Sequence, residues 1–286
     1  MAATAGHQEE LRGEPLGILA GGGAFPLLVA ESAVRSGRPV FIFGIVEEAS
    51  PGIERFPHRW IRRGQLGALF SGMRQRGIRD LVLIGGIRDR RMPRLNEIDL
   101  GGVWAVLRHI RLLSRGDDGV LRRIARFFEA NGLKVVGAAE VAPELTIAAG
   151  VATTRAPTEA ERADISAGLA AAREHGARDL GQAVIVQNGE VVLTETRDGT
   201  DALLAAYRES GRRCGVLVKC LKPNQDRRLD MPAIGPETAE GVIAAGLAGI
   251  AVSARTTLVV DGAQVVRLLD AAGAFLVAIA DEENVE

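Results

Sequence analysis

Cysteine and histidine are scarce in this sequence, and their scarcity argues against several kinds of site. The chain of 286 residues has two cysteines, Cys214 and Cys220, too few for a disulfide framework or a zinc knuckle. They flank the apolar run 215–219, so we expect both to be small buried residues in a reducing compartment. The four histidines show no ligand spacing, which disfavours zinc or di-iron and leaves a hard cation as the better candidate.

An excess of charge and a long apolar segment are also absent. The 35 Lys and Arg residues nearly balance the 36 Asp and Glu residues, and a net charge of −1 gives no long-range attraction for nucleic acid. The longest run of apolar residues and glycine, about 241–252, is shorter than the ~18 residues of a membrane-spanning helix. Residues 1–15 lack the apolar core of a signal peptide. We therefore expect a cytoplasmic protein that does not bind nucleic acid.

Aliphatic residues must build the core, because aromatic residues make up 4% of the chain and hydrophobic residues 47%. This composition suits parallel sheets covered by helices. In the first half, short apolar strands alternate with amphipathic helices, which predicts a doubly wound, Rossmann-like parallel sheet. The expected strands are 16–20, 40–46, 80–84 and 133–136, and the expected helices are 26–36, 65–76, 103–113 and 120–130.

The second half has a different pattern. We interpret 141–158 as a linker between a nucleotide-binding domain, 1–140, and a catalytic α/β domain, 159–286. Asn188-Gly189 between two apolar runs predicts an antiparallel hairpin, so the second sheet should be mixed. The expected helices are 159–175, 200–210 and 236–246, and the expected strands are 183–187, 190–196, 215–219, 250–252, 257–260 and 275–280.

The loop 219–230 concentrates polar residues directly after an apolar strand, and Pro223 and Pro232 restrict its backbone. Asp226 and Asp230 offer the hard oxygen ligands that Mg²⁺ prefers. The cations that can neutralise phosphate oxygens are Lys219, Lys222 and Arg228. A solvated surface loop with fortuitous ion pairs is the alternative interpretation.

Glycine turns and aspartate turns precede several of the expected helices. Gly21, Gly22 and Gly23 follow the first strand, where a phosphate can approach the backbone and the N-terminus of the next helix. The alternative interpretation is a tight turn that binds no ligand. Pro26 stands where the third glycine of the dinucleotide fingerprint belongs, which argues against a standard NAD site. We interpret the turns 116–119 and 199–201 first as helix caps, with contacts to a ligand as the alternative. Their polar residues are Asp117, Asp118, Thr200 and Asp201.

Several sequence blocks together resemble the UDP-2,3-diacylglucosamine pyrophosphatases of the LpxI type. The blocks are LGILAGGGAFP (16–26), GDDGVLR (116–122), PEL (143–145), GQAV (181–184), GTD (199–201), KPNQD (222–226) and AGLAGIA (245–251). Each block alone is ordinary, but their order and spacing are specific and cover nearly the whole chain after Pro15. The departures are small, with Arg197 in place of an expected acid and Ala233 in place of a threonine.

The resemblance implies two α/β domains with a lipid-sugar substrate held between them. It also implies Mg²⁺-dependent hydrolysis of UDP-2,3-diacylglucosamine to 2,3-diacylglucosamine 1-phosphate (lipid X) and UMP, in lipid A synthesis of Gram-negative bacteria. Asp226 matches the catalytic aspartate of the family, and with Asp230 it is expected to hold Mg²⁺ or orient water. The remaining expected catalytic residues are Lys219, Lys222, Gln225 and Arg228, and the expected substrate-binding residues are Gly21, Gly22, Gly23, Asp117, Asp118, Gln182, Thr200 and Asp201.

Further expectations concern partners and rival functions. A lipid substrate implies transient contact with the inner-membrane surface, and an apolar groove for acyl chains is expected along 242–252. A homodimer is expected because two-fold dimers are the commonest oligomers. The alternatives left open are a glycosyltransferase-like enzyme and a non-catalytic nucleotide-binding module, with an NAD-linked reductase the weakest.

Overall fold

The structure, a computed structural model, describes residues 13–89, 97–101, 103, 104, 107, 120–178, 180–223 and 225–280. The chain divides into two compact units. The N-terminal unit comprises Met1–Pro143 together with the short insertion Asp226–Asp230, and the C-terminal unit comprises Glu144–Gln225 and Met231–Glu286. The predicted α/β class with one parallel and one mixed sheet is confirmed, and each unit is described separately below.

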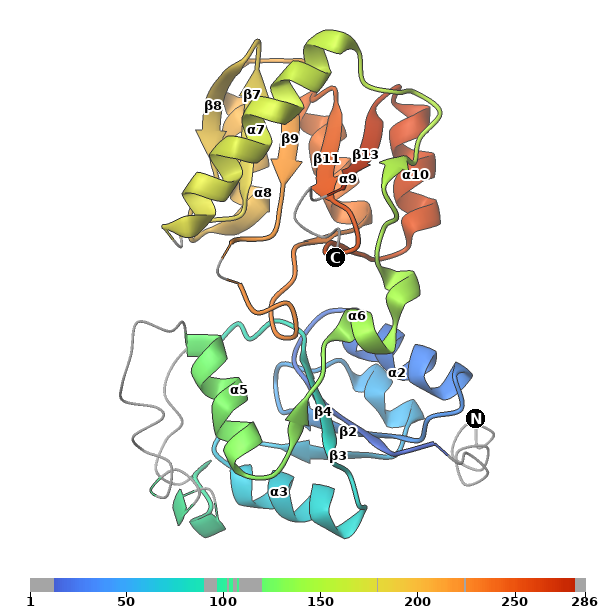
Figure 1. The fold of residues 1–286 in the computed structure, drawn as a ribbon, viewed down its shortest axis with the longest axis vertical. Helices are drawn as coiled ribbons and strands as arrows, with labels where there is room; N and C mark the ends of the chain where they lie inside the picture. The colour runs from blue at the N-terminus through green and yellow to red at the C-terminus, as the bar shows by residue number, and fades with distance from the viewer. Residues whose placement is uncertain are drawn as a thin grey trace. The chain divides into compact units, whose positions relative to one another are not determined.

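The described part of the N-terminal unit contains a five-stranded parallel sheet (Figure 1). Its strands are β1 (Leu16–Ala20), β2 (Val40–Ile45), β3 (His58–Ile61), β4 (Asp80–Ile84) and β5 (Lys134–Val135). They lie in the order β3-β2-β1-β4-β5, so the direction of winding reverses between β1 and β4. In open sheets of this kind, ligands bind beyond the carboxyl ends of the strands at such a reversal. The glycine turns after β1 and β4 occupy that position.

Helices cover both faces of this sheet, which is why its strands read as continuous apolar runs. The helices are α2 (Phe25–Arg35), α3 (Leu66–Gln75), α5 (Val120–Ala130) and α6 (Ala138–Val141), and η1 (Pro51–Arg55) is a short 3₁₀ helix. Phe41, Phe43 and Leu81 share a buried cluster with residues of α3 and α5, whereas α2 contacts α6 as well as β1 and β2. The predicted helix 103–113 lies mostly outside the described residues; Val103, Trp104 and Leu107 are helical.

The C-terminal unit contains, in its described residues, a six-stranded mixed sheet. Its strands are β6 (Gly150–Val151), β7 (Ala183–Gln187), β8 (Glu190–Thr194), β9 (Val216–Lys219), β11 (Gly249–Ser253) and β13 (Phe275–Ile279). The order is β6-β13-β11-β9-β7-β8, in which β9, β11 and β13 are mutually parallel and the pairs β6–β13, β9–β7 and β7–β8 are antiparallel. Asn188 and Gly189 have φ of 55° and 79°, the left-handed values that a two-residue hairpin turn requires.

Two different layers cover the faces of this sheet (Figure 1). On one face, Val184, Val186 and Val218 pack in a cluster with residues of α7 (Glu159–Ala177). On the other face, strand residues pack with α8 (Gly199–Glu209), α9 (Pro236–Ala245) and α10 (Gly262–Ala271). The two remaining short strands, β10 (Ala233–Ile234) and β12 (Leu258–Val259), pair with each other. No helix among the described residues is both long enough and apolar enough to span a membrane.

Three features differ from the expectations. Cys220 is buried as predicted, but Cys214 is exposed and has a φ of 63°, because it lies in the turn before β9 rather than on the strand. The segment interpreted as a linker contributes β6, which pairs with β13, and the 3₁₀ helix η3 (Pro143–Leu145). Residues 226–230 belong to the N-terminal unit, since Leu229 packs against its core.

Candidate functional site

The two glycine turns of the N-terminal sheet pack backbone against backbone. Gly22 donates its amide to the carbonyl of Gly86 at 2.7 Å, and the amide of Gly86 donates to the carbonyl of Gly22 at 3.0 Å. A Cβ atom on Gly21 would lie 2.6 Å from the Gly86 oxygen, and Gly85 has a φ of 101°. A side chain is excluded at Gly21 and Gly85, so these two glycines allow the close backbone approach at the reversal point of the sheet.

Gly23 differs from the two preceding glycines. The amides of Gly21 and Gly22 are used inside the turn, the first donating to Ile84 at 2.9 Å. Gly23 is exposed with a φ of 92°, and a Cβ there would meet nothing within 4 Å. It precedes α2, whose N-cap residue Ala24 supplies no side-chain hydrogen bond. Any phosphate at this turn would therefore meet Gly23 and the first turn of α2.

A neighbouring loop at the same end of the sheet is fixed by charge. The carboxylate of Glu48 accepts the amides of Arg88 and Asp89, both at 2.9 Å, and Asp89 forms an ion pair with Arg63 at 2.6 Å. The two backbone hydrogen bonds hold the pKa of Glu48 below its usual value. The expected contacts Asp117 and Asp118, like the arginines that follow Asp89, lie outside the described residues.

In the C-terminal unit, three expected site residues come together at the carboxyl end of β9. The Lys219 side chain is buried, and its Nζ donates to Oγ1 of Thr200 at 2.8 Å. The Thr200 hydroxyl donates in turn to Oε1 of Glu195 at 2.6 Å. The other carboxylate oxygen of Glu195 accepts the amide of Gln182 at 2.7 Å. We call these four residues the β9 cluster.

The β9 cluster contains one polar group that has no hydrogen-bond partner in the part of the chain that the structure describes. Oε1 of Gln182 is buried and accepts no hydrogen bond from any described residue, although the main chain of Gln182 is paired with Cys220. A buried unsatisfied acceptor is rare in native proteins and is often completed by water or a ligand. The β9 cluster therefore combines a fixed cation with an acceptor that remains to be satisfied.

Glu195 was not predicted, although it connects the other members of the β9 cluster. It is buried, and its carbonyl lies 2.7 Å from Nε2 of His175. A single glutamate just after a strand carries no local signal of burial, because the strand pattern alone does not reveal which neighbours enclose it.

The turn that follows β9 is closed by its own polar groups. The amide of Lys222 donates to Oε1 of Gln225, and the amide of Gln225 donates to the carbonyl of Lys222, both at 3.0 Å. Nε2 of Gln225 is buried without a partner among the described residues. The stem of Lys222 packs on Gly176 of α7, where a Cβ would come within 3.0 Å of it. Gln225 thus shapes the turn and leaves one donor for a ligand.

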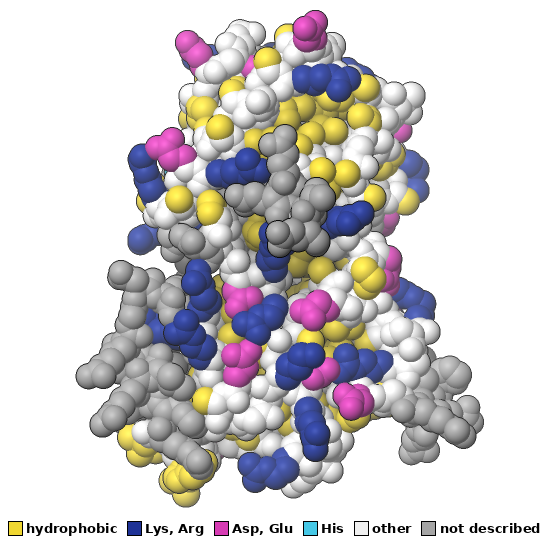
Figure 2. Space-filling model, viewed as in Figure 1, with side chains coloured by type: hydrophobic (Ala, Val, Ile, Leu, Met, Phe, Trp, Pro, Cys, Tyr) yellow, Lys and Arg dark blue, Asp and Glu magenta, His cyan; other side chains and the backbone are white. Residues whose placement is uncertain are grey.

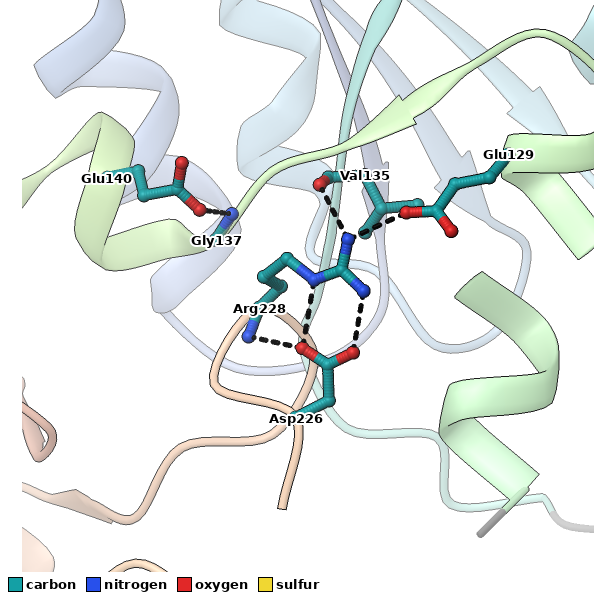
Figure 3. A network of polar contacts seen from close by, with 6 residues as sticks. All are labelled: Glu129, Val135, Gly137, Glu140, Asp226 and Arg228. Carbon is teal, nitrogen blue, oxygen red and sulfur yellow. Dashed lines mark hydrogen bonds and ion pairs between the residues drawn. The ribbon is translucent and has the colours of Figure 1, made fainter. Parts of the chain in front are cut away.

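Asp226 and Arg228 form a fork in which both carboxylate oxygens are used (Figure 3). Oδ1 of Asp226 accepts from the amide and Nε of Arg228 at 3.0 Å each, and Oδ2 accepts from Nη2 at 2.8 Å. Asp230 closes the same turn, donating its amide to the carbonyl of Asp226 at 3.1 Å. The fork is local, spanning three residues, and we call it the Asp226–Arg228 pair.

The Asp226–Arg228 pair is docked on the N-terminal unit. Nη1 of Arg228 reaches Oε1 of Glu129 at 2.6 Å and the carbonyl of Val135 at 3.5 Å (Figure 3). The side chain of Asp226 is 15% exposed, whereas that of Arg228 is 37% exposed. The hydrogen bonds from Arg228 lower the pKa of Asp226, and the same contact raises the pKa of the guanidinium. Asp226 is therefore an ionised carboxylate at neutral pH.

The carboxylates fit magnesium only in part. Among the described residues, no group of three His, Cys, Asp or Glu side chains is placed to hold a metal ion, and Arg228 occupies both oxygens of Asp226. Mg²⁺ is commonly held by one or two carboxylates, water and substrate phosphates. Asp226 and Asp230 are carboxylates of the kind that this mode of binding uses, and among the described residues they are not part of a site built from protein ligands alone.

Asp201 lies apart from the residues of the β9 cluster. Although it follows Thr200 directly, it lines an open hollow of about 360 Å³ on α8 and α9 together with Leu204, Arg208 and Glu240. The structure therefore separates the two residues of the GTD turn. Thr200 belongs to the β9 cluster, and Asp201 faces a hollow lined by both apolar and charged residues.

These features define an α/β protein with a Rossmann-like parallel sheet, a mixed second sheet and polar residues beyond the strand ends. Comparison with known proteins identifies its family: the LpxI N-terminal domain matches residues 15–145 and the LpxI C-terminal domain matches residues 148–277. The chain is 35% identical over 279 residues to UDP-2,3-diacylglucosamine pyrophosphatase LpxI of Caulobacter vibrioides, covering 94% of this chain and 99% of that relative. The chain belongs to the LpxI family, which confirms the resemblance inferred from its sequence blocks.

Proposed function

We propose that this protein hydrolyses the diphosphate of UDP-2,3-diacylglucosamine to 2,3-diacylglucosamine 1-phosphate and UMP, as a step of lipid A synthesis. The near full-length similarity to a pyrophosphatase of that name supports the substrate. The structural observation that carries the proposal is the β9 cluster, in which a buried lysine is held at a strand end by a threonine and a glutamate. A fixed cation of this kind is what a diphosphate requires.

The proposed chemistry needs an aligned water and neutralised phosphate oxygens. Water attacks the β-phosphorus, the bond from that phosphorus to the bridging oxygen breaks, and UMP leaves with the bridging oxygen. Asp226 orients the water and accepts its proton, for which an ionised carboxylate is suited. Lys219 and Lys222 neutralise the non-bridging oxygens, with Gln225 adding a hydrogen-bond donor.

Arg228 has a linked role in the proposal. Its guanidinium keeps Asp226 ionised and occupies both carboxylate oxygens. Asp226 must exchange part of that fork for water or metal before it can act, and the released guanidinium is then available to a phosphate oxygen. Mg²⁺, held by Asp226 and Asp230 with the substrate phosphates, would supply further neutralisation of charge.

The nucleotide end of the substrate is assigned to the N-terminal unit. Gly23 and the first turn of α2 present backbone amides at the reversal point of the parallel sheet, where nucleotides bind in open α/β folds. Gly21 and Gly22 hold this turn in place through their close backbone contacts with Gly85 and Gly86. We further propose a cytoplasmic homodimer that makes transient contact with the inner membrane, because its substrate is a lipid.

Incubation of the purified protein with UDP-2,3-diacylglucosamine and Mg²⁺, without any acceptor, tests the proposal. We expect UMP and the sugar 1-phosphate in equal amounts, and loss of turnover in EDTA that added Mg²⁺ restores. With ¹⁸O-labelled water, the label should appear in the sugar phosphate. A strict need for a second sugar would instead indicate a transferase, and nucleotide binding without turnover would indicate a binding module; either result contradicts the proposal.

A further inference from the structure

An apolar stripe lies exposed on the N-terminal unit. Leu100, Val103, Trp104 and Leu107 are all helical and follow the spacing that places side chains on one face of a helix. Their exposed fractions are 89%, 40%, 58% and 63%. Single exposed apolar residues are ordinary, but four on one helical face form a patch that soluble proteins generally cover. We call these four residues the apolar stripe.

The start of the stripe is anchored to the unit by polar and close backbone contacts. Asp99 accepts the amides of Gly67 and Ala68 at 2.9 and 2.8 Å, and so caps the first turn of α3. The amide of Val103 donates to the carbonyl of Asp99 at 3.0 Å. A Cβ on Gly101 would lie 2.8 Å from the Cα of Gly67. The helix therefore begins against α3 while the stripe faces solvent.

The sequence around the stripe is strongly basic. Residues 86–126 contain ten arginines and five Asp or Glu residues, a net charge of +5 in a chain whose total is −1. An exposed leucine lies nearby in sequence, since Leu121 of α5 is 43% exposed. Figure 2 shows one face of the molecule, on which apolar side chains reach the surface at the lower left, near the segment drawn teal in Figure 1.

We propose that the apolar stripe is a membrane-docking surface that inserts into the headgroup region of an anionic bilayer. This inference rests on the proposed function to the extent that a lipid substrate brings the enzyme to a bilayer. Tryptophan and leucine on one helical face, flanked by arginine, are the composition of helices that lie in the plane of an interface. The net positive charge adds attraction to anionic headgroups within a Debye length.

A second copy of the chain is a poorer occupant of the stripe. Across a two-fold axis the stripe would face itself, and in both copies the sequence on either side of it has an excess of arginine. Like charges at an interface oppose association, whereas an anionic bilayer complements them. The charge of the segment thus distinguishes the two occupants.

The two tryptophans of the chain, Trp60 and Trp104, allow a direct test. In the Trp60→Phe variant, Trp104 is the sole reporter, and we expect its emission to shift to the blue with vesicles of phosphatidylethanolamine and phosphatidylglycerol. Trp60, at the edge strand β3, serves as the matched control: the Trp104→Phe variant should show no shift. Vesicles of phosphatidylcholine alone, or raised salt, should weaken the response.

Substitutions in the apolar stripe test membrane binding separately from hydrolysis. Combining Leu100→Gln with Leu107→Gln should lower vesicle co-sedimentation by at least about tenfold, because it removes two inserted apolar side chains. The control is Leu180→Gln, which changes a leucine that is 48% exposed in the C-terminal unit and should leave binding unaltered. The wild type, the double variant and Leu180→Gln should hydrolyse detergent-dispersed substrate at the same rate.

The outcomes distinguish failure of this inference from failure of the proposed function. Equal vesicle binding by the double variant and the wild type overturns the docking surface while hydrolysis still stands. A dimer that dissociates in the double variant, with no binding to vesicles by the wild type, assigns the stripe to self-association and also overturns it. Vesicle binding without any hydrolysis leaves the docking surface in place and removes the proposed substrate.

Discussion

The β9 cluster and the Asp226–Arg228 pair are built in opposite ways. The Asp226–Arg228 pair is local, with both partners in one turn and the arginine 37% exposed. The β9 cluster draws its residues from the end of β9, the start of α8 and the segments that flank the hairpin, and both Lys219 and Glu195 are buried. The Asp226–Arg228 pair is held by a few strong contacts that solvent can reach. The β9 cluster depends on the tertiary structure, because its residues come from separate segments of the chain.

This difference predicts how each cluster responds to change. A partly exposed ion pair contributes modestly to folding and can exchange partners, which suits a carboxylate that must be released before acting. A buried network cannot lose one member without leaving another unsatisfied. Substitutions in the Asp226–Arg228 pair should therefore alter chemistry with little effect on stability, whereas substitutions in the β9 cluster should alter both.

The largest effect is expected for Asp226→Asn. The amide keeps the shape of the carboxylate and an oxygen that Arg228 can donate to, but it cannot accept a proton from water. We expect kcat to fall by roughly 10²- to 10⁴-fold, the usual contribution of a general base, while substrate binding and the thermal midpoint stay close to wild type. Steady-state hydrolysis, substrate binding and thermal unfolding measure the three quantities.

Glu129→Gln is the matched control for that variant. It removes the other carboxylate contact of Arg228 and leaves Asp226 in place. Activity should remain within a few-fold of wild type, since exposed pairs contribute ~0–1 kcal/mol. If Asp226→Asn were nearly as active as wild type, or if Glu129→Gln lost activity equally, Asp226 would have no special role.

An intermediate effect is expected for Thr200→Val, which preserves shape and removes the hydroxyl that connects Lys219 to Glu195. Misplacing the ammonium should reduce kcat/KM by about 10- to 100-fold. Stability should also fall by about 1–3 kcal/mol, because buried polar groups lose their partner. Hydrolysis kinetics and denaturant unfolding measure both effects in one set of proteins.

Thr200→Ser and Thr196→Val serve as controls for this variant. Serine retains the hydroxyl and should restore most of the activity. Thr196 is exposed and its hydroxyl hydrogen-bonds to the side chain and amide of Asp198, outside the β9 cluster, so its loss should change neither property. Comparable losses in the serine and valine variants at position 200 would mean that packing, rather than the hydrogen bond, maintains the cluster.

The same contrast explains how much could be predicted from the sequence. The strands β1, β2, β4 and β7 were predicted to within one residue, since short apolar runs between glycines leave few alternatives. β3 was missed because His58–Ile61 is a polar, partly exposed edge strand without a clear pattern. α10 was also missed, although Asp261 caps it and Val265 and Leu269 follow at helical spacing.

The residues of the two candidate sites also differ in how far they could be predicted from the sequence. The carboxylate and cations of 219–230 could be found because they are adjacent in the chain, and the family blocks singled out Gln182 and Thr200. Glu195 could not be found, because only the pairing of β7 with β8 and β9 brings it near Lys219. The insertion of 226–230 into the N-terminal unit likewise depends on Leu229 and Arg228 finding partners about a hundred residues away.

The smallest effect is expected from acid titration of the Asp226–Arg228 pair. Because the arginine lowers the pKa of Asp226, the pair contributes stability that is fully present above the ordinary value of 3.8 and is lost as the pH falls through the lowered pKa. Arg228→Met should raise the pKa of Asp226 toward its ordinary range, which ¹³C NMR of the carboxyl carbon measures. At neutral pH this variant should be less stable than wild type by no more than about 1 kcal/mol.

The difference in unfolding free energy between wild type and Arg228→Met should close as the pH falls below 3.8, because protonated Asp226 no longer attracts the guanidinium. Arg227→Met is the matched control, since it removes an equal charge from an exposed neighbour in the same turn. That control should leave the titration of Asp226 nearly unchanged. An Asp226 pKa that stays low in Arg228→Met would show that the docked turn, rather than the fork, keeps the carboxylate ionised, and the two clusters would then be less different than their contacts indicate.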